Sequence, residues 1–181
     1  MRLRAEELKR RADQAGVSAE QLADAVSRDG LKGAAAVSAV KNWTAGRDHP
    51  RCRRVDVENL ATAVGALPKD IAKFTSMVRG HRGSPKKAKL VADLIRGKDA
   101  IDADNMLRFS TKRAAVNFRK ALLAAMSDAD QLGADQGNLI VSEARVDGGM
   151  HIKRFKAKDR GRAHQILKRT SHITLSVQER N

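Results

Sequence analysis

Apolar positions at helical spacing dominate the first 75 residues of the chain. Apolar side chains recur three and four residues apart, which places them on one face of a helix. Gly16, Gly46 and Gly65 follow three of these repeats, and glycine commonly ends a helix. Ser18 and Gln21 have the spacing of a capping box. The pattern predicts helices over residues 4–15, 18–26, 34–43 and 56–64, and a last helical turn that Pro68 opens and that contains Ile71 and Phe74.

From Ser84 onward, helical spacing gives way to strand alternation. Ser84 and Pro85 are favoured at the N-cap and first position of a helix. The pattern predicts helices over residues 86–96, 103–109 and about 111–130, strands over 139–146 and 166–177, and an edge strand over 73–79. Asp147, Gly148 and Gly149 are typical of a turn or bulge. We therefore predict an α+β fold class over residues 76–181, with a small antiparallel sheet, three helices and a long extended β-hairpin. A small all-α domain over residues 1–75 precedes it.

The segment between the two predicted strands is strongly basic. Residues 145–169 hold nine Lys or Arg and two acidic residues, and Ile152 and Phe155 are the large hydrophobic residues of its middle part, 152–163. Burial of so few apolar side chains does not offset the entropy lost on ordering the segment. We therefore expect the segment to be mobile in isolation. A solvated basic loop is the alternative. Because the chain returns to a strand, we favour a projecting arm that binds a polyanion.

The charge of the whole chain points to the same partner. The formal net charge is +15 and the isoelectric point is about 10.6. Residues 1–75 carry 14 basic and 10 acidic side chains, whereas residues 76–181 carry 22 and 11. This balance favours nucleic acid, with an anionic membrane surface second. No apolar run approaches the roughly 20 residues that span a bilayer, and the first residues lack the apolar core of a signal peptide, so we expect a cytoplasmic protein.

Residue chemistry gives little support to an enzyme. Cys52 is the single cysteine and the five histidines are scattered, so we expect no metal site and no cofactor. The pair Ser171 and His172 has no acidic residue placed to orient the imidazole, and neighbours in a strand point to opposite faces. Aromatic residues make up 3% of the chain, too few for base-stacking platforms. We therefore predict a binding protein without a small-molecule substrate.

Three segments of the first 75 residues resemble the repressor-like helix-turn-helix domains: 16–26, 38–46 and 55–65. The resemblance implies that the helix ending near Trp43 enters the DNA major groove, with Ser38, Lys41 and Asn42 as the possible DNA-binding residues. The connection over residues 27–33 is longer than the tight turn of that family, and the presumed reading helix begins with Ala34-Ala-Ala-Val37. A DNA-binding transcriptional regulator is thus the alternative function, and a helical bundle that docks on protein or RNA is favoured.

Residues 76–179 resemble a universal ribosomal protein family, family twenty-two of the large subunit. The segments that carry the resemblance are 84–98, 111–115, 141–147, 161–163 and 167–174. The resemblance implies a structural protein that binds large-subunit ribosomal RNA, and a hairpin that helps line the nascent-peptide exit tunnel. Its implied partners are this RNA, neighbouring ribosomal proteins and the nascent polypeptide. The tip, about residues 150–163, departs from the family in having no proline and in holding Asp159.

Charge pattern and resemblance together define the candidate site residues. The tunnel-facing tip is expected to include Ile152, Lys153, Arg154, Phe155 and Lys156. Lys and Arg are expected to hold phosphates, while RNA shape and 2′-hydroxyl groups give specificity. The predicted rRNA-binding residues are Arg79, Arg82, Ser84, Lys86, Lys87, Lys89, Arg96, Lys98, Lys112, Arg113, Lys153, Arg154, Lys156, Lys158, Arg160, Arg162, Lys168, Arg169, Ser171 and His172.

Overall fold

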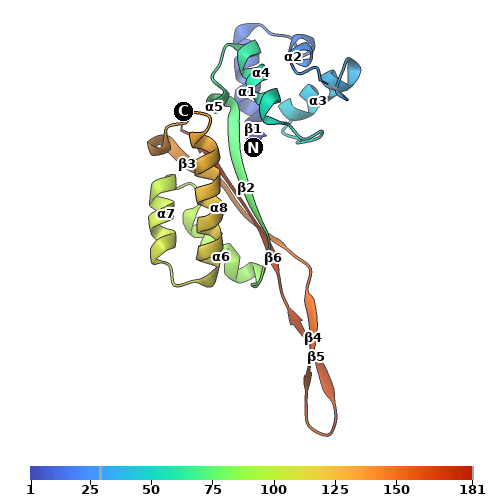
Figure 1. Ribbon diagram of the computed structural model, residues 1–181, viewed down its shortest axis with the longest axis vertical. Helices are drawn as coiled ribbons and strands as arrows, with labels where there is room; N and C mark the ends of the chain where they lie inside the picture. Colours follow the sequence, from blue (N-terminus) through green and yellow to red (C-terminus); the bar gives the residue numbers. More distant parts are fainter. Residues whose placement is uncertain (29, 181) are drawn as a thin grey trace. The chain divides into compact units, whose positions relative to one another are not determined.

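The computed structural model describes residues 1–28 and 30–180, and the chain forms two compact units (Figure 1). The first unit contains residues 1–74 and 128–134. The second contains residues 75–127 and 135–180.

Five helices build the first unit. They are α1 (Ala5–Ala15), α2 (Ala19–Ala25), α3 (Ala34–Thr44), α4 (Arg54–Val64) and α5 (Pro68–Ile71). Leu8, Leu22, Val40, Trp43 and Leu60 are buried between them, which is the apolar face that the helical spacing predicts. The strand β1 (Arg2–Leu3) pairs antiparallel with the first residues of β2 (Ala72–His81).

Local capping signals were correct in this unit, and one longer-range prediction was wrong. The Ser18 hydroxyl accepts a hydrogen bond from the Gln21 backbone, and the Gln21 side chain accepts one from the Ser18 backbone. Gly16 and Gly65 end α1 and α4 in the left-handed conformation. Phe74, however, lies in β2 and not in the last helical turn. The helix ends at Ile71 because the next two residues pair with β1, which overrides local helical spacing.

The second unit combines three helices with an antiparallel β3–β6 pair. The helices are α6 (Pro85–Ile95), α7 (Ala100–Phe109) and α8 (Arg113–Asp130), whose last three residues belong to the first unit. The strands follow the order β1, β2, β6 (Ser171–Glu179), β3 (Leu139–Gly148), so β2 lies between β1 and β6, and its pairing with β1 is limited to Ala72 and Lys73. The 3-10 helix η1 (Gln136–Asn138) precedes β3. Phe118, Leu122, Ile95, Ile173 and Leu175 are buried in its core. The α+β prediction is confirmed.

A second, two-stranded sheet forms the projecting arm (Figure 1). Its strands β4 (Ile152–Ala157) and β5 (Ala163–Lys168) pair antiparallel over their whole length. At the tip, the Lys158 amide donates to the Arg162 carbonyl at 2.7 Å, and Arg160 and Gly161 have positive φ angles. The predicted long hairpin is therefore confirmed.

The junction between the arm and the main sheet differs from the prediction. The returning strand was expected to be continuous over residues 166–177, but it is divided into β5 and β6. The outgoing strand β3 passes through Gly148, which pairs with Ser171, so the expected turn at residues 147–149 is displaced. The Thr170 hydroxyl donates to the Met150 carbonyl at 2.6 Å, and the Gly149 amide donates to the Thr170 carbonyl at 2.9 Å. These contacts replace regular strand pairing at the junction.

Candidate nucleic-acid interface

Basic side chains gather in two adjoining pockets of the second unit, close to the base of the arm. The first pocket has a volume of about 500 Å³ and the second of about 340 Å³. Arg82, Gly83 and Arg113 line both, so the two pockets form one continuous surface. We call this surface the basal pockets. Among the residues that the structure describes, no acidic side chain lines either of them.

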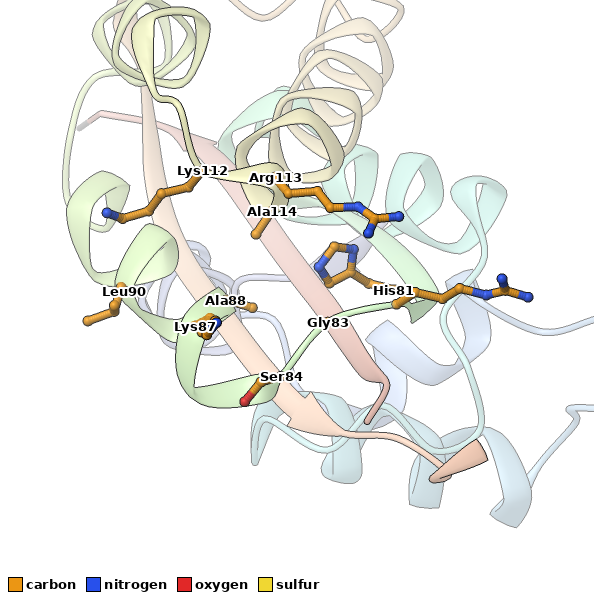
Figure 2. Close-up of a pocket in the computed structure, with 10 residues that line it drawn as sticks. His81, Gly83, Ser84, Lys87, Ala88, Leu90, Lys112, Arg113 and Ala114 are labelled. Atoms are coloured by element: carbon orange, nitrogen blue, oxygen red, sulfur yellow. The ribbon is translucent and has the colours of Figure 1, made fainter. Parts of the chain in front are cut away.

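Three chain segments meet at the first basal pocket (Figure 2). The end of β2 contributes His81, the start of α6 contributes Ser84 and Lys87, and the start of α8 contributes Lys112 and Arg113. Arg82 and Gly83 of the loop after β2, with apolar side chains of α6 and α8, form the rest of its wall. A Cβ atom at Gly83 would lie 2.5 Å from His81 Nε2, so only glycine lets the loop pass this close to the imidazole.

His81 supports the pocket but does not add a charge to it. Its side chain is buried, and Asn117 Nδ2 lies at hydrogen-bond distance, 2.6 Å, from His81 Nδ1. Burial, and then the nearby positive charge of Arg113, lower the pKa of His81 below its ordinary value of 6.5. The imidazole is therefore neutral at neutral pH, and the positive charge of this pocket comes from its Lys and Arg side chains.

The N-terminal turn of α6 adds further positive charge beside the first pocket. Lys86, Lys87 and Lys89 are exposed there, although cations at a helix N-terminus oppose the helix dipole. No ion pair in the described part of the chain neutralises them. An anion at this surface would remove the unfavourable interaction.

The second basal pocket lies where the arm begins. Arg82 and Arg113 face Arg154 of β4, Lys168 of β5 and Arg169 of the junction, so five cationic side chains line one small volume. Their mutual repulsion is relieved when a polyanion enters, and guanidinium groups match phosphate oxygens in paired hydrogen bonds. The pocket therefore has the chemistry of a phosphate-binding site.

The other predicted rRNA-binding residues of the second unit fall into two groups. Those with exposed side chains are Arg79, Lys98, Lys153, Lys156, Lys158, Arg160 and Arg162. Arg96 is also exposed, but its guanidinium donates to the Ala144 carbonyl at 2.6 Å and pairs with Asp93 at 2.9 Å. His172 Nδ1 accepts a hydrogen bond from the Gly80 amide, which ties β6 to β2. These two side chains thus have structural partners.

Ser171, which is also among the predicted rRNA-binding residues, is buried in the isolated protein. Its exposed fraction is 0%, and it is the first residue of β6, paired with Gly148 of β3. Ser171 lies on the same face of β6 as Ile173, Leu175 and Val177, so strand alternation turns its side chain inward. Gly83 and Thr170, by contrast, line the pockets and were missed. Neither residue carries charge or a motif that marks it in the sequence.

The three possible DNA-binding residues lie on α3 of the first unit. Ser38 and Lys41 are exposed, whereas the Asn42 amide donates to the His49 carbonyl at 3.0 Å. Asn42 therefore has a role in holding the following loop. Nothing in the structure supports reading of DNA bases by this helix.

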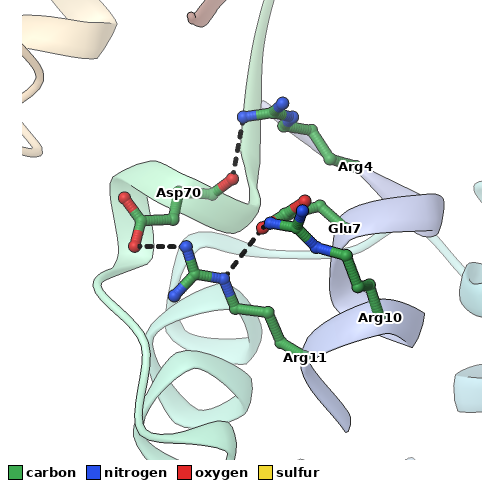
Figure 3. Close-up of polar contacts among 5 residues, drawn as sticks. All are labelled: Arg4, Glu7, Arg10, Arg11 and Asp70. Atoms are coloured by element: carbon green, nitrogen blue, oxygen red, sulfur yellow. Dashed lines mark hydrogen bonds and ion pairs between the residues drawn. The ribbon is translucent and has the colours of Figure 1, made fainter. Parts of the chain in front are cut away.

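A buried carboxylate in the first unit has a structural role (Figure 3). Glu7 of α1 accepts hydrogen bonds from Arg10 at 2.6 Å and Arg11 at 2.9 Å. Arg11 also pairs with Asp70 of α5 at 3.1 Å, and Arg4 donates to the Asp70 carbonyl. Burial raises the pKa of Glu7, but the hydrogen bonds from Arg11 and Arg10 outweigh it, so the pKa lies below the ordinary 4.5. The network connects the first helix to the last.

We expect Glu7→Gln to destabilise the first unit by about 1 to 3 kcal/mol, because it removes charge-assisted hydrogen bonds from a buried site. Trp43 is the single tryptophan and is buried in this unit, so its fluorescence reports unfolding there. Because folding lowers the pKa of Glu7, its contribution is complete above pH 4.5 and is lost as the pH falls through the folded-state value. Glu6→Gln, an exposed neighbour, is the control. Equal unfolding curves for the two variants would contradict this role.

Within the described ranges, 1–28 and 30–180, no three His, Cys, Asp or Glu side chains come together as metal ligands. No helix in those ranges has both the length and the apolar character to cross a membrane.

Comparison with known proteins identifies the family of the second unit. Residues 76–178 match the family model described as ribosomal protein L22p/L17e, and the first 75 residues lie outside that match. The chain is also similar to the large ribosomal subunit protein uL22 of Magnetococcus marinus. The two are 52% identical over 98 residues, which cover 54% of this chain and 87% of that protein. The chain belongs to the ribosomal protein L22p/L17e family.

Proposed function

We propose that this protein is a structural component of the large ribosomal subunit, and that it binds ribosomal RNA through the basal pockets and the arm. Its family membership supports the ribosomal role, and in that role the protein is cytoplasmic and has neighbouring ribosomal proteins as partners. The observation that carries the proposal for the binding surface is the set of five cationic side chains around the second basal pocket, with no carboxylate among the described residues that line it.

The basal pockets would position the protein on the RNA backbone. Lys and Arg contacts to phosphate fix the orientation of a protein without reading sequence, so specificity falls to RNA shape and to 2′-hydroxyl groups. The scarcity of aromatic residues agrees with this mode, because base stacking has little part in it. We further propose that Ser84, Lys87 and Lys112 contact RNA within the first pocket, and that Lys86 and Lys89 of α6 extend the contact along the RNA.

The arm is the proposed tunnel-lining element. Its residues are exposed on both strands, and Phe155 keeps 80% of its surface exposed. A large apolar side chain that is exposed on a cationic hairpin is typical of an interaction site, so we expect a partner to cover Phe155 in the assembled particle. We propose that RNA surrounds the arm and that the strand β4, from Ile152 to Lys156, faces the nascent polypeptide. These residues were expected at the tip, but they run along the arm from its base, and the turn lies at residues 158–162.

The two units are proposed to be separate domains with a boundary near residue 75. The family match begins at residue 76, and the compact second unit begins at residue 75. The helix-turn-helix resemblance of the first unit is supported by neither the family match nor the α3 side chains, so we do not propose a role in transcription.

The basal pockets can be tested with Arg82→Ala combined with Arg113→Ala. Each phosphate contact contributes about 0.7 to 0.9 to the slope of log affinity against log salt. Affinity for large-subunit rRNA drops by some factor when salt rises from 50 to 200 mM. This factor should be roughly tenfold smaller for the variant than for the unmodified protein. The measurement is filter binding of the full chain at several salt concentrations.

Arg108→Ala with Lys120→Ala is the matched control, because it removes two exposed charges of the second unit that lie outside the pockets. Its salt dependence should equal that of the unmodified protein. If both double variants change the slope equally, the pockets are not distinct binding sites, and the affinity for RNA depends only on the net charge of the protein.

A further inference from the structure

The first unit carries a cationic surface of its own, although the family match does not include this unit. A pocket of about 630 Å³ is lined by Arg28, Arg51, Arg53 and Arg54. We call it the arginine pocket. Arg51 and Arg53 come from the connection between α3 and α4, Arg54 is the first residue of α4, and Arg28 comes from the connection that precedes α3.

Hydrogen bonds hold the loop that presents these arginines in a fixed shape. Trp43 Nε1 donates to the Pro50 carbonyl at 2.6 Å, and the Asn42 amide donates to the His49 carbonyl at 3.0 Å. The Cys52 amide donates to the Asp48 carboxylate at 3.1 Å. A ligand that binds this loop does not have to order it first, which favours affinity.

The acidic residues nearby are already engaged. Asp56 is 1% exposed, accepts a hydrogen bond from the Arg53 amide at 2.8 Å and pairs with Arg28 at 3.2 Å. Asp48 pairs with Arg2 at 3.4 Å. Asp56 thus pairs with one pocket arginine, and Glu58 pairs with another, Arg54, at 2.8 Å. The exposed positive charge of the arginine pocket therefore comes from Arg51 and Arg53.

The guanidinium groups of Arg51 and Arg53 remain available to an anion. The side chains of Arg51 and Arg53 are exposed, and no ion pair among the described residues engages them. Nε and Nη1 of Arg28 are shielded from solvent and have no hydrogen-bond partner in the described part of the chain. Shielded donors without an acceptor are unfavourable, and a nearby anion stabilises such a charge.

Charge is also divided within the unit. Residues 28–54 hold seven basic and two acidic residues, whereas residues 5–25 hold three basic and five acidic residues. The positive potential is therefore concentrated on the segment that forms the arginine pocket. The start of α4, at Arg54, adds the positive end of a helix dipole to the same surface.

We propose that the arginine pocket binds phosphate groups of an RNA backbone, which gives the first unit an RNA contact independent of the arm. Guanidinium groups bind phosphate oxygens in pairs and stay charged at every physiological pH. RNA is favoured over duplex DNA because the second unit belongs to a ribosomal family and covalent linkage keeps the first unit at a high local concentration near ribosomal RNA.

The test uses the full chain with Arg51→Gln and Arg53→Gln. The matched control is Lys9→Gln with Lys41→Gln, which removes two exposed charges of the same unit outside the pocket, one of them on α3. Binding to a labelled large-subunit rRNA transcript is followed from 50 to 200 mM salt. The factor by which affinity drops over this range should be roughly tenfold smaller for the pocket variant than for the unmodified protein. For the control variant, this factor should equal that of the unmodified protein. Trp43 fluorescence checks that the unit stays folded.

Three results would overturn the proposal. The first is an unchanged salt dependence in the pocket variant, and the second is an equal change in the control variant. The third is a loss confined to a duplex DNA probe, which would assign the pocket to DNA. The Arg82→Ala, Arg113→Ala variant is measured beside them. If that variant alone weakens RNA binding, the basal-pocket proposal stands and only the arginine pocket is rejected.

Discussion

Replacing Lys153, Arg154, Lys156 and Lys158 together by alanine should strongly flatten the salt dependence of binding to large-subunit rRNA. All four side chains are exposed on the arm and its tip. If each contacts a phosphate, the plot of log affinity against log salt becomes less steep, and the magnitude of its slope decreases by about 3. Between 50 and 200 mM salt the unmodified protein would then lose roughly 50-fold more affinity than the variant.

The control for this variant removes the same charge elsewhere. Lys9, Lys41, Arg108 and Lys120 are exposed and lie outside the arm, the basal pockets and the arginine pocket. Their replacement by alanine should leave the slope close to that of the unmodified protein. Were the arm variant to keep the original slope, the arm would not be the main phosphate-contacting element. The proposal that it is surrounded by RNA would then fall.

Short-range signals made much of the fold predictable. A glycine can end a helix, and a Ser or Pro can begin one, through contacts that span a few residues. Gly16, Ser18 and Gly65 therefore marked the helix boundaries of the first unit correctly. The alternation of Ile173, Leu175 and Val177 likewise gave the buried face of β6, although Thr174 and Ser176 are buried on this strand as well.

Features that depend on contacts between distant segments were not predictable in this way. Phe74 follows a helical turn but lies in a strand, because Ala72 and Lys73 pair with β1, about 70 residues earlier in the chain. The Ser176 hydroxyl lies 2.9 Å from the Thr75 hydroxyl, which explains how a polar residue is accommodated inside β6. No local pattern contains either contact.

In the candidate site, too, local features could be predicted from the sequence and long-range contacts could not. Its cations were visible in the sequence because charge is a property of single residues. Their grouping into two pockets depends on the meeting of β2, α6, α8 and the arm, and on a glycine that fits against His81. The arginine pocket was missed for a related reason. The basic turn at residues 47–54 was visible, but the fixed loop shape and the engagement of Asp56 appear only in the folded unit.

The connection between the arm and the main sheet leads to the last prediction, which concerns Gly149→Ala. A Cβ atom at this position would lie 2.5 Å from Thr170 Oγ1 and 3.2 Å from the Thr170 carbonyl carbon. Backbone must therefore move, and the hydrogen bonds that Thr170 makes with Met150 and Gly149 weaken. We expect a loss of about 2 to 3 kcal/mol in the stability of the second unit, from overpacking together with weakened hydrogen bonds.

Gly148→Ala provides a closely matched control, because a Cβ atom at Gly148 meets nothing within 4 Å. Calorimetry gives the stability of each variant, and amide hydrogen exchange at Gly149 reports the junction directly. Thr170→Ala removes the nearest clashing atom, so Gly149→Ala should cost less in that background than alone. If Gly149→Ala behaves like Gly148→Ala, the close approach of Thr170 does not hold the arm to the sheet. A selective effect at Gly149 would show instead that this contact sets the geometry with which the arm leaves the second unit.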